Sequence, residues 1–149
     1  GVSPDRLAPR IMQVVGLRTD QVLAVERFRA RLLSDGVTPD RADARVAKYA
    51  EAQLRSRATL ISRTEMVDTA NAGQNELWNA ARGAGDLDPE TTRRTWIVTP
   101  DDRLDLVVCE PMDGQEVKLD EPFTTGDGRQ IMRPTAHPAC RCGVGLVFS

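Results

Sequence analysis

The six residues from His137 to Cys142, His-Pro-Ala-Cys-Arg-Cys, constrain this chain more than any other stretch. They contain the only histidine and two of the three cysteines, and the third cysteine, Cys109, lies in the same C-terminal third of the sequence. Four ligands made of three cysteines and one histidine match the tetrahedral zinc sites of proteins. We therefore expect Cys109, His137, Cys140 and Cys142 to bind Zn²⁺.

The spacing of these residues supports a metal site only in part. His137 and Cys140 are separated by two residues, as in a zinc knuckle, whereas Cys140 and Cys142 are closer together than the usual pair. Two alternatives stay open: a disulfide between Cys109 and one of the other cysteines, or three free thiols in a small core. The odd cysteine count argues mildly against a framework of disulfides alone.

Helix signals fill the first 85 residues. Ser-Pro-Asp at 3–5 and Thr-Pro-Asp at 38–40 place a cap residue before a proline, and Asp35-Gly36 is typical of a helix end. We expect a short helix up to about Gly16, a second over 17–34, and a third that begins at Pro39. A long helix, bent near Arg57, then continues to about Arg82.

An apolar stripe follows the long helix, and polar residues lie on it. Within an arc of roughly 140° the helix places Leu60, Met66, Val67, Ala70, Leu77, Trp78 and Ala81. Arg63, Asn71 and Gln74 fall in the same arc, and buried polar groups need partners. We expect them to bind loops of the C-terminal half; the alternative is that they line the edge of the stripe and reach water.

After Gly83-Ala84-Gly85 the sequence changes to short β-rich runs separated by turns. We expect strands near 95–98, 104–109, 116–119, 130–132 and 143–148, with a hairpin turn at 125–128. The sequence thus predicts an α+β protein. A helical part over 1–85 precedes a small antiparallel β module over 86–149, which packs on the long helix and is stapled by a metal.

Charge and hydropathy exclude some classes of protein. Residues 1–82 carry 13 Lys/Arg against 10 Asp/Glu, and residues 83–149 carry 7 against 12, so neither half has the concentrated positive charge typical of DNA-binding proteins. No apolar run approaches the roughly 20 residues that cross a bilayer, and the N-terminal segment does not have the pattern of a signal peptide. Because the sequence begins with glycine, we expect a processed or excised chain.

Four motifs in the order of the chain resemble those of the phage Mu F-like minor head proteins, also called head morphogenesis proteins. The helix segment Ile-Ser-Arg-Thr-Glu at 61–65, followed by Asn71, is similar to the family's Ile-Ala-Arg-Thr-Glu…Asn block. Trp96 before the Asp-Asp-Arg turn at 101–103 and the Met-Asp-Gly-Gln at 112–115 are similar to two further blocks. The ending at 137–142 matches the family's His-Pro-x-Cys-Arg-Cys. Leu106 stands where relatives often have the first cysteine of a Cys-x-x-Cys pair, which leaves Cys109 as the only upstream ligand.

The resemblance implies a virion component of a tailed phage, present in the host cytoplasm during assembly. Such a protein associates with the portal protein and other capsid components at the portal vertex and takes part in head morphogenesis or DNA packaging and delivery. Contacts with other copies of itself are compatible with this role, whereas DNA contact is not supported by the charge. The block at 61–71 implies structural roles for Arg63, Glu65 and Asn71.

The expected role needs no catalytic residue, so we expect a protein that is not an enzyme. Three alternatives are a metal-dependent hydrolase in which Glu110 or Asp102 acts as general base, a nucleic-acid-binding zinc module, and the carrier domain of a larger phage-linked effector or toxin. Four protein ligands would close the coordination shell, which argues against the hydrolase. We expect the partner contacts to lie on the helical half, over about 17–57.

Overall fold

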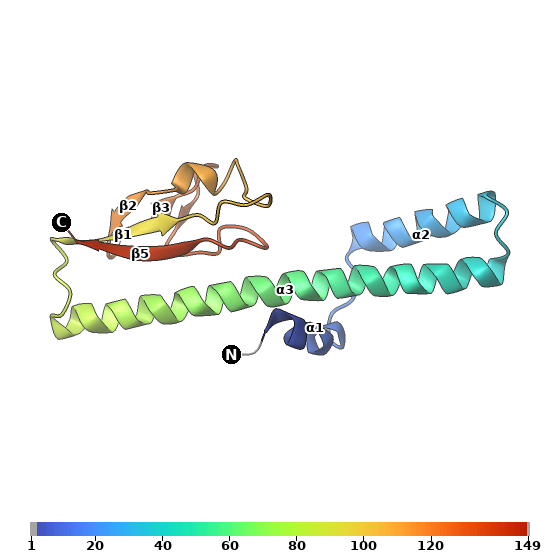
Figure 1. Ribbon diagram of the computed structural model, residues 1–149, viewed down its shortest axis with the longest axis horizontal. Helices are drawn as coiled ribbons and strands as arrows, with labels where there is room; N and C mark the ends of the chain where they lie inside the picture. Colours follow the sequence, from blue (N-terminus) through green and yellow to red (C-terminus); the bar gives the residue numbers. More distant parts are fainter. Residues whose placement is uncertain (1–2, 149) are drawn as a thin grey trace. The chain divides into compact units, whose positions relative to one another are not determined.

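The computed structural model describes residues 3–148, apart from the side chain of Asp5, and confirms the α+β class (Figure 1). The helices are α1 (Pro4–Met12), α2 (Thr19–Ser34) and α3 (Pro39–Ala84), and the strands are β1 (Thr92–Ile97), β2 (Glu116–Lys118), β3 (Phe123–Thr124), β4 (Gln130–Ile131) and β5 (Gly143–Phe148), with a short 3₁₀ helix at Glu110–Met112. The chain forms two compact units, Gly1–Ser62 and Arg63–Ser149, which divide inside α3 rather than after it. None of the helices described is long and apolar enough to cross a membrane.

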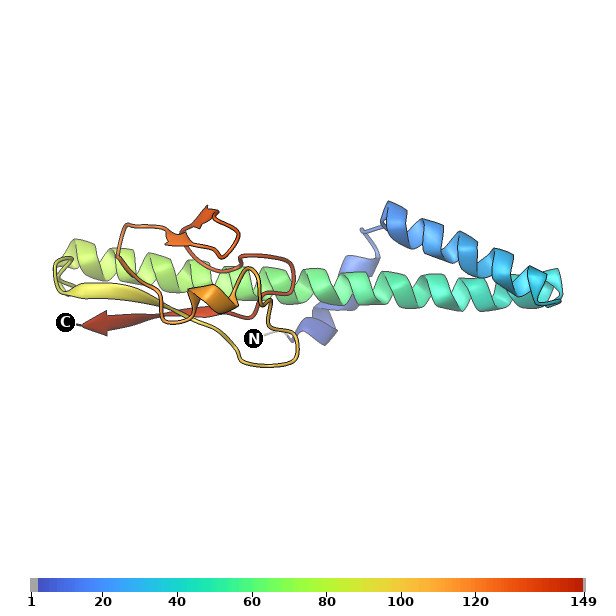
Figure 2. The same ribbon diagram turned by 90° about the horizontal axis from the view of Figure 1, so that it is seen from above.

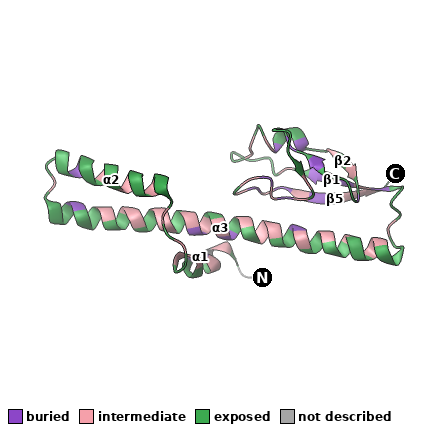
Figure 3. Ribbon diagram, turned by 180° about the vertical axis from the view of Figure 1, so that it is seen from behind, coloured by how far each residue is buried: buried purple, intermediate pink, exposed green. Residues whose placement is uncertain are grey.

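The N-terminal unit is built around an antiparallel pair formed by α2 and the first part of α3 (Figure 1). Helix α2 ends where predicted: Gly36 has φ +78°, and the backbone N–H groups of Gly36 and Val37 donate to Leu33 and Leu32. Glycine adopts this left-handed conformation at a helix end without strain, because glycine has no Cβ. Between the helices, the rings of Phe28 and Tyr49 lie 4.8 Å apart. Most of α2 is exposed to solvent (Figure 3).

Helix α3 is a single element of 46 residues, longer than the separate helices expected. Pro39 occupies its first position, where a missing N–H costs nothing, and no further proline follows until Pro89. The bend expected near Arg57 therefore has no proline to cause it, and the structure gives one continuous helix through that residue.

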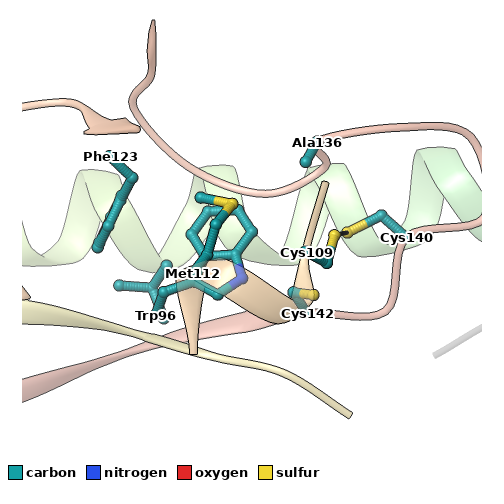
Figure 4. Close-up of a cluster of buried hydrophobic side chains, with 8 residues drawn as sticks. Trp96, Cys109, Met112, Phe123, Ala136, Cys140 and Cys142 are labelled. Atoms are coloured by element: carbon teal, nitrogen blue, oxygen red, sulfur yellow. Dashed lines mark hydrogen bonds between the residues drawn. The ribbon is translucent and has the colours of Figure 1, made fainter. Parts of the chain in front are cut away.

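The C-terminal unit contains a three-stranded antiparallel sheet in the order β2-β1-β5 and a small β3-β4 hairpin. In the central strand β1, alternate residues Thr92, Arg94 and Trp96 point inward and are buried. The core they help to form consists of Trp96, Cys109, Met112, Phe123, Ala136, Cys140, Cys142 and Val144 (Figure 4). Three of its eight residues are the cysteines, so the candidate site is part of the core rather than an attachment to it.

The second part of α3 contacts the β module through polar groups. Thr64 accepts a hydrogen bond from the backbone N–H of Ala139 at 2.9 Å, and Asp68 lies 3.4 Å from Arg133. The expected apolar stripe does not coincide with this face of α3. Leu77, which belongs to the stripe, is 68% exposed, whereas Trp78 packs against the core. The contact face is polar because the β module offers backbone N–H groups and an arginine to the helix, which an apolar face could not satisfy.

Candidate metal centre

Cys109 is positioned by a turn that Asp105 organises. The Asp105 carboxylate accepts hydrogen bonds from the backbone N–H groups of Val107 and Val108, at 3.0 and 2.8 Å, and its carbonyl accepts one from Cys109. These bonds replace the strand that we expected over 104–109, because an aspartate side chain that binds the next backbone N–H groups favours a turn. They also hold the pKa of Asp105 below its ordinary value.

The hairpin β3-β4 holds the same turn from the other side. The backbone N–H of Gly126 donates to the carbonyl of Val108 at 3.0 Å. A Cβ at position 126 would lie 1.9 Å from the carbonyl oxygen of Val107, so only glycine fits there. The turn that carries Cys109 is therefore fixed on both sides.

The other ligands come from the loop between β4 and β5. The backbone N–H of Cys140 donates to the carbonyl of His137 at 3.1 Å, which closes a tight turn, and Ala139 within it has φ +65°. The loop is anchored by an ion pair between Arg141 and Asp101 and by the Thr99 hydroxyl, which donates to the Arg141 carbonyl at 2.9 Å.

The structure brings Cys109, His137 and Cys140 together: one ligand atom from each lies within 4.8 Å of the other two, so the group could hold a metal ion. The Sγ atoms of Cys109 and Cys140 are 3.9 Å apart. Two sulfur ligands of a tetrahedral ion at the zinc–sulfur distance of about 2.3 Å lie about 3.8 Å apart, so this pair already has the separation that an ion requires. All three cysteines are free thiols in this structure.

His137 presents the correct nitrogen to the sulfur atoms. Its Nδ1–H donates to the carbonyl of Pro138 at 2.8 Å, which leaves Nε2, 3.1 Å from Cys109 Sγ, free to bind an ion. A tetrahedral zinc ion would separate nitrogen and sulfur ligands by about 3.6 Å. The separation of His137 Nε2 and Cys109 Sγ is therefore about half an ångström shorter than in a zinc site.

Cys142 is the fourth expected ligand, and it lies beside the group without belonging to it. It is buried and shares one end of the core with Cys109 and Cys140 (Figure 4). The thiol hydrogen bond from Cys142, together with the backbone N–H groups of Ala136 and Cys142, lowers the pKa of Cys140 to about 5. Burial and the Cys140 charge raise the pKa of Cys109 to about 12, and the hydrogen bond to Cys140 raises that of Cys142.

The space at the site fits one ion and little else. All four expected ligands line a cavity of about 10 Å³, together with Asp105 and Arg103 among others. A volume of this size holds roughly one water molecule. The centre therefore has room for a bound ion.

Residues 61–71 differ from what we expected. Arg63 and Glu65 are exposed, and Arg63 donates none of the hydrogen bonds found among residues 3–148, which corrects the expectation that it binds the β module. Asn71 is buried, but its amide donates to the carbonyl of Val67 one turn back in the helix rather than to a loop. Its partner lies in its own helix because that carbonyl is the nearest acceptor to a short side chain.

Arg94, which no sequence motif indicated, has the role expected of Arg63. Its side chain is 1% exposed and lies over the ring of Phe123 at 5.1 Å. Its guanidinium donates to the carbonyls of Met132 (2.6 Å), Lys118 (3.4 Å) and Glu121 and to the side-chain oxygen of Asn75 (3.4 Å). Its spacing of two residues from Trp96 could have indicated that Arg94 is buried, since residues i and i+2 of a strand share a face.

Comparisons of the chain with protein-family models, with curated proteins and with solved structures gave no match.

Proposed function

We propose that this protein is a structural, non-catalytic component of a tailed-phage head, and that a Zn²⁺ ion staples its C-terminal unit. The observation that carries the proposal is a Cys/His set in a small β module, with its cysteines buried in the core, His137 half-buried beside them, and room for one ion. A bound zinc would act as a cross-link between the Cys109 turn and the loop that holds His137 and Cys140.

Zinc is the ion that suits these ligands best. Thiolates and a neutral imidazole select zinc over the harder cations magnesium and calcium, which prefer oxygen. The low pKa of Cys140 and the backbone N–H groups around its sulfur favour a thiolate before any ion binds. Cys142 is the natural fourth ligand, since it lines the same cavity as Cys109, His137 and Cys140.

A structural role fits the site better than hydrolysis. Catalytic zinc keeps a coordination position open to substrate, whereas here all three cysteines are buried and the cavity holds about 10 Å³. Asp105, the carboxylate that lines the cavity, already accepts two backbone hydrogen bonds. This arrangement favours an ion that holds the fold.

The phage-head role rests on the four motifs in their order along the sequence. The N-terminal unit adds a surface for a partner: α2 exposes Val22, Leu23 and Leu33. We propose that this unit docks on the portal protein or a neighbouring capsid component, in the virion and in the host cytoplasm during assembly. Apolar side chains on an exposed helix are typical of such contacts.

The metal is tested by elemental analysis of protein purified without added metal. We expect about one zinc per chain in the wild type, loss of zinc in Cys140→Ser, and retention in the control Met112→Leu, which conserves volume in the same core. Less than about a tenth of an equivalent of zinc, with a folded C-terminal unit, would rule out the staple. If reductant rather than chelator unfolds the unit, a disulfide is the correct interpretation.

The ligand set is tested by counting protons released on zinc binding, by calorimetry in two buffers of different ionisation enthalpy at pH 8. Cys140, with a pKa of about 5, is already a thiolate there, whereas Cys109 is protonated. We expect two protons to be released if Cys142 also binds and one if it does not.

The partner is tested by co-expression of the chain with the portal protein of the phage that encodes it, followed by cross-linking. Cross-links from residues 17–57 to the portal are the expected outcome. Cross-links found only within 95–149, or a chain absent from purified virions, would contradict the assignment. This outcome is independent of the zinc assay, so the two halves of the proposal can fail separately.

A further inference from the structure

The three-stranded sheet has two edges of different character. The order β2-β1-β5 places β2 at one edge and β5 at the other. Strand β2 has three residues, two of them the charged Glu116 and Lys118, which is how natural proteins protect an edge. Strand β5 has six residues, Gly-Val-Gly-Leu-Val-Phe, with no charge and no proline. Its edge lacks the usual protection.

The outer edge of β5 is open within the C-terminal unit. Among residues 3–148, β5 pairs only with β1, and Figure 2 shows no other element of the unit beyond the edge of its C-terminal half. Phe148, at the end of the strand, is 67% exposed. An open edge offers a row of backbone N–H and C=O groups to another strand.

We propose that β5 pairs with β5 of a second copy of this chain, so that two sheets join into one of six strands. Strand pairs with like charges opposite each other are destabilised. In a symmetric pair, β5 lies against an identical strand, so any charge on it would face a strand of like charge. Strand β5 carries no charge, so this repulsion does not arise. A second copy can therefore pair with this edge without placing like charges opposite each other.

Symmetry fixes how the two strands meet. A two-fold axis perpendicular to the sheet runs β5 antiparallel to its mate and keeps the inner faces together. Val144, Leu146 and Phe148 share the inner face, because Val144 lies opposite the buried Trp96. With Leu146 on the axis, Phe148 of each copy lies opposite Val144 of the other, and Gly145 opposite Val147. The exposed ring thereby gains an apolar neighbour.

Six-residue strands form a small interface, so we expect a dimer that dissociates on dilution. Sedimentation velocity of the zinc-loaded chain from low to several hundred micromolar measures it. The test variant is Phe148→Glu, which places charge at the edge where the ring is exposed, and the matched control is Ile97→Glu, a half-exposed residue on the central strand. The wild type and the control are expected to dimerise and Phe148→Glu to remain monomeric.

Hydrogen exchange of the wild type gives a second measurement that needs no variant. The backbone amides of β5 should exchange more slowly at high than at low protein concentration, while those of β2 do not change. A monomer at every concentration, a dimer that survives Phe148→Glu, or equal loss of the dimer in both variants would overturn the proposal. The result does not depend on which ion fills the metal centre.

Discussion

Replacement of Arg94 tests the account of how the β module is held together. Its guanidinium joins three backbone carbonyls, those of Lys118, Glu121 and Met132, so it ties β1 to the ends of β2 and β4. Arg94→Lys retains the charge but loses the planar fork that serves several acceptors at once. At least two of these carbonyls would then lose the guanidinium as their donor.

The expected loss of unfolding free energy in Arg94→Lys can be worked out from the two closest hydrogen bonds. Hydrogen bonds from a charged donor contribute about 1.5–3 kcal/mol each, and the bonds to Met132 and Glu121 are the two close ones. Their loss therefore costs about 3–6 kcal/mol, a large part of the roughly 5–15 kcal/mol by which a domain is stable. Burial, which lowers the pKa of Arg94 because it disfavours the charged form, offsets part of the gain that the bonds provide.

Arg63→Lys is the control, since Arg63 is exposed on α3 in the same unit. A surface change of this kind is expected to stay within about 0.5 kcal/mol of the wild type. Urea unfolding with zinc in excess, followed by tryptophan fluorescence, compares the variants, because Trp96 is buried in the core next to Phe123. An Arg94→Lys curve that overlays the wild type, or an equal loss in Arg63→Lys, would contradict this role of Arg94.

Three further predictions concern the loops. Gly126→Ala forces a Cβ into a backbone carbonyl and should cost about 1–3 kcal/mol or more in urea unfolding. Ala139→Gly should raise the melting temperature slightly, because Ala139 holds φ +65°, where a side chain costs about 1–2 kcal/mol and the added entropy of glycine offsets only part of that. Hydrogen bonds from Thr125 and then Arg129 hold the pKa of Asp127 below its ordinary value, so the folded state binds fewer protons than the unfolded state and the carboxylate stabilises it above that ordinary value. The stability difference between the wild type and Asp127→Asn should therefore shrink as the pH falls from 6 to 3, and a constant difference would contradict the assignment.

Local signals in the sequence predicted local features well. The end of α2 at Ser34 follows from Gly36, whose left-handed φ needs no partner elsewhere in the chain. The association of Cys109 with His137 and Cys140 was also predictable, because few residue types can form such a site and the sequence has only these three and Cys142. In both cases the residue type itself specifies the geometry.

Features that depend on a distant partner were not predictable. The face of α3 that meets the β module was expected to be apolar, yet Thr64, Asp68 and Asn75 lie there, bonded to Ala139, Arg133 and Arg94. Periodicity finds the face that would bury most apolar surface and assumes an apolar neighbour. Here the neighbour presents backbone amides and guanidinium groups, and only the tertiary structure shows that.

The composition of the core supports our proposal that an ion holds this module together. Its strands have six, three, two, two and six residues, and three of the eight buried core residues are cysteines. Thiols bury little apolar surface, so the hydrophobic contribution from this end of the core is small. The ligands Cys109 and His137 are 28 residues apart, and an ion between them closes a loop that otherwise has little to hold it. Zinc bound by thiolates can contribute on the order of 10 kcal/mol to such a fold, more than these thiols could gain by burial alone. We therefore propose that the cysteines stabilise the unit chiefly as ligands, and we expect chelation to loosen the β module while α2 and α3 persist.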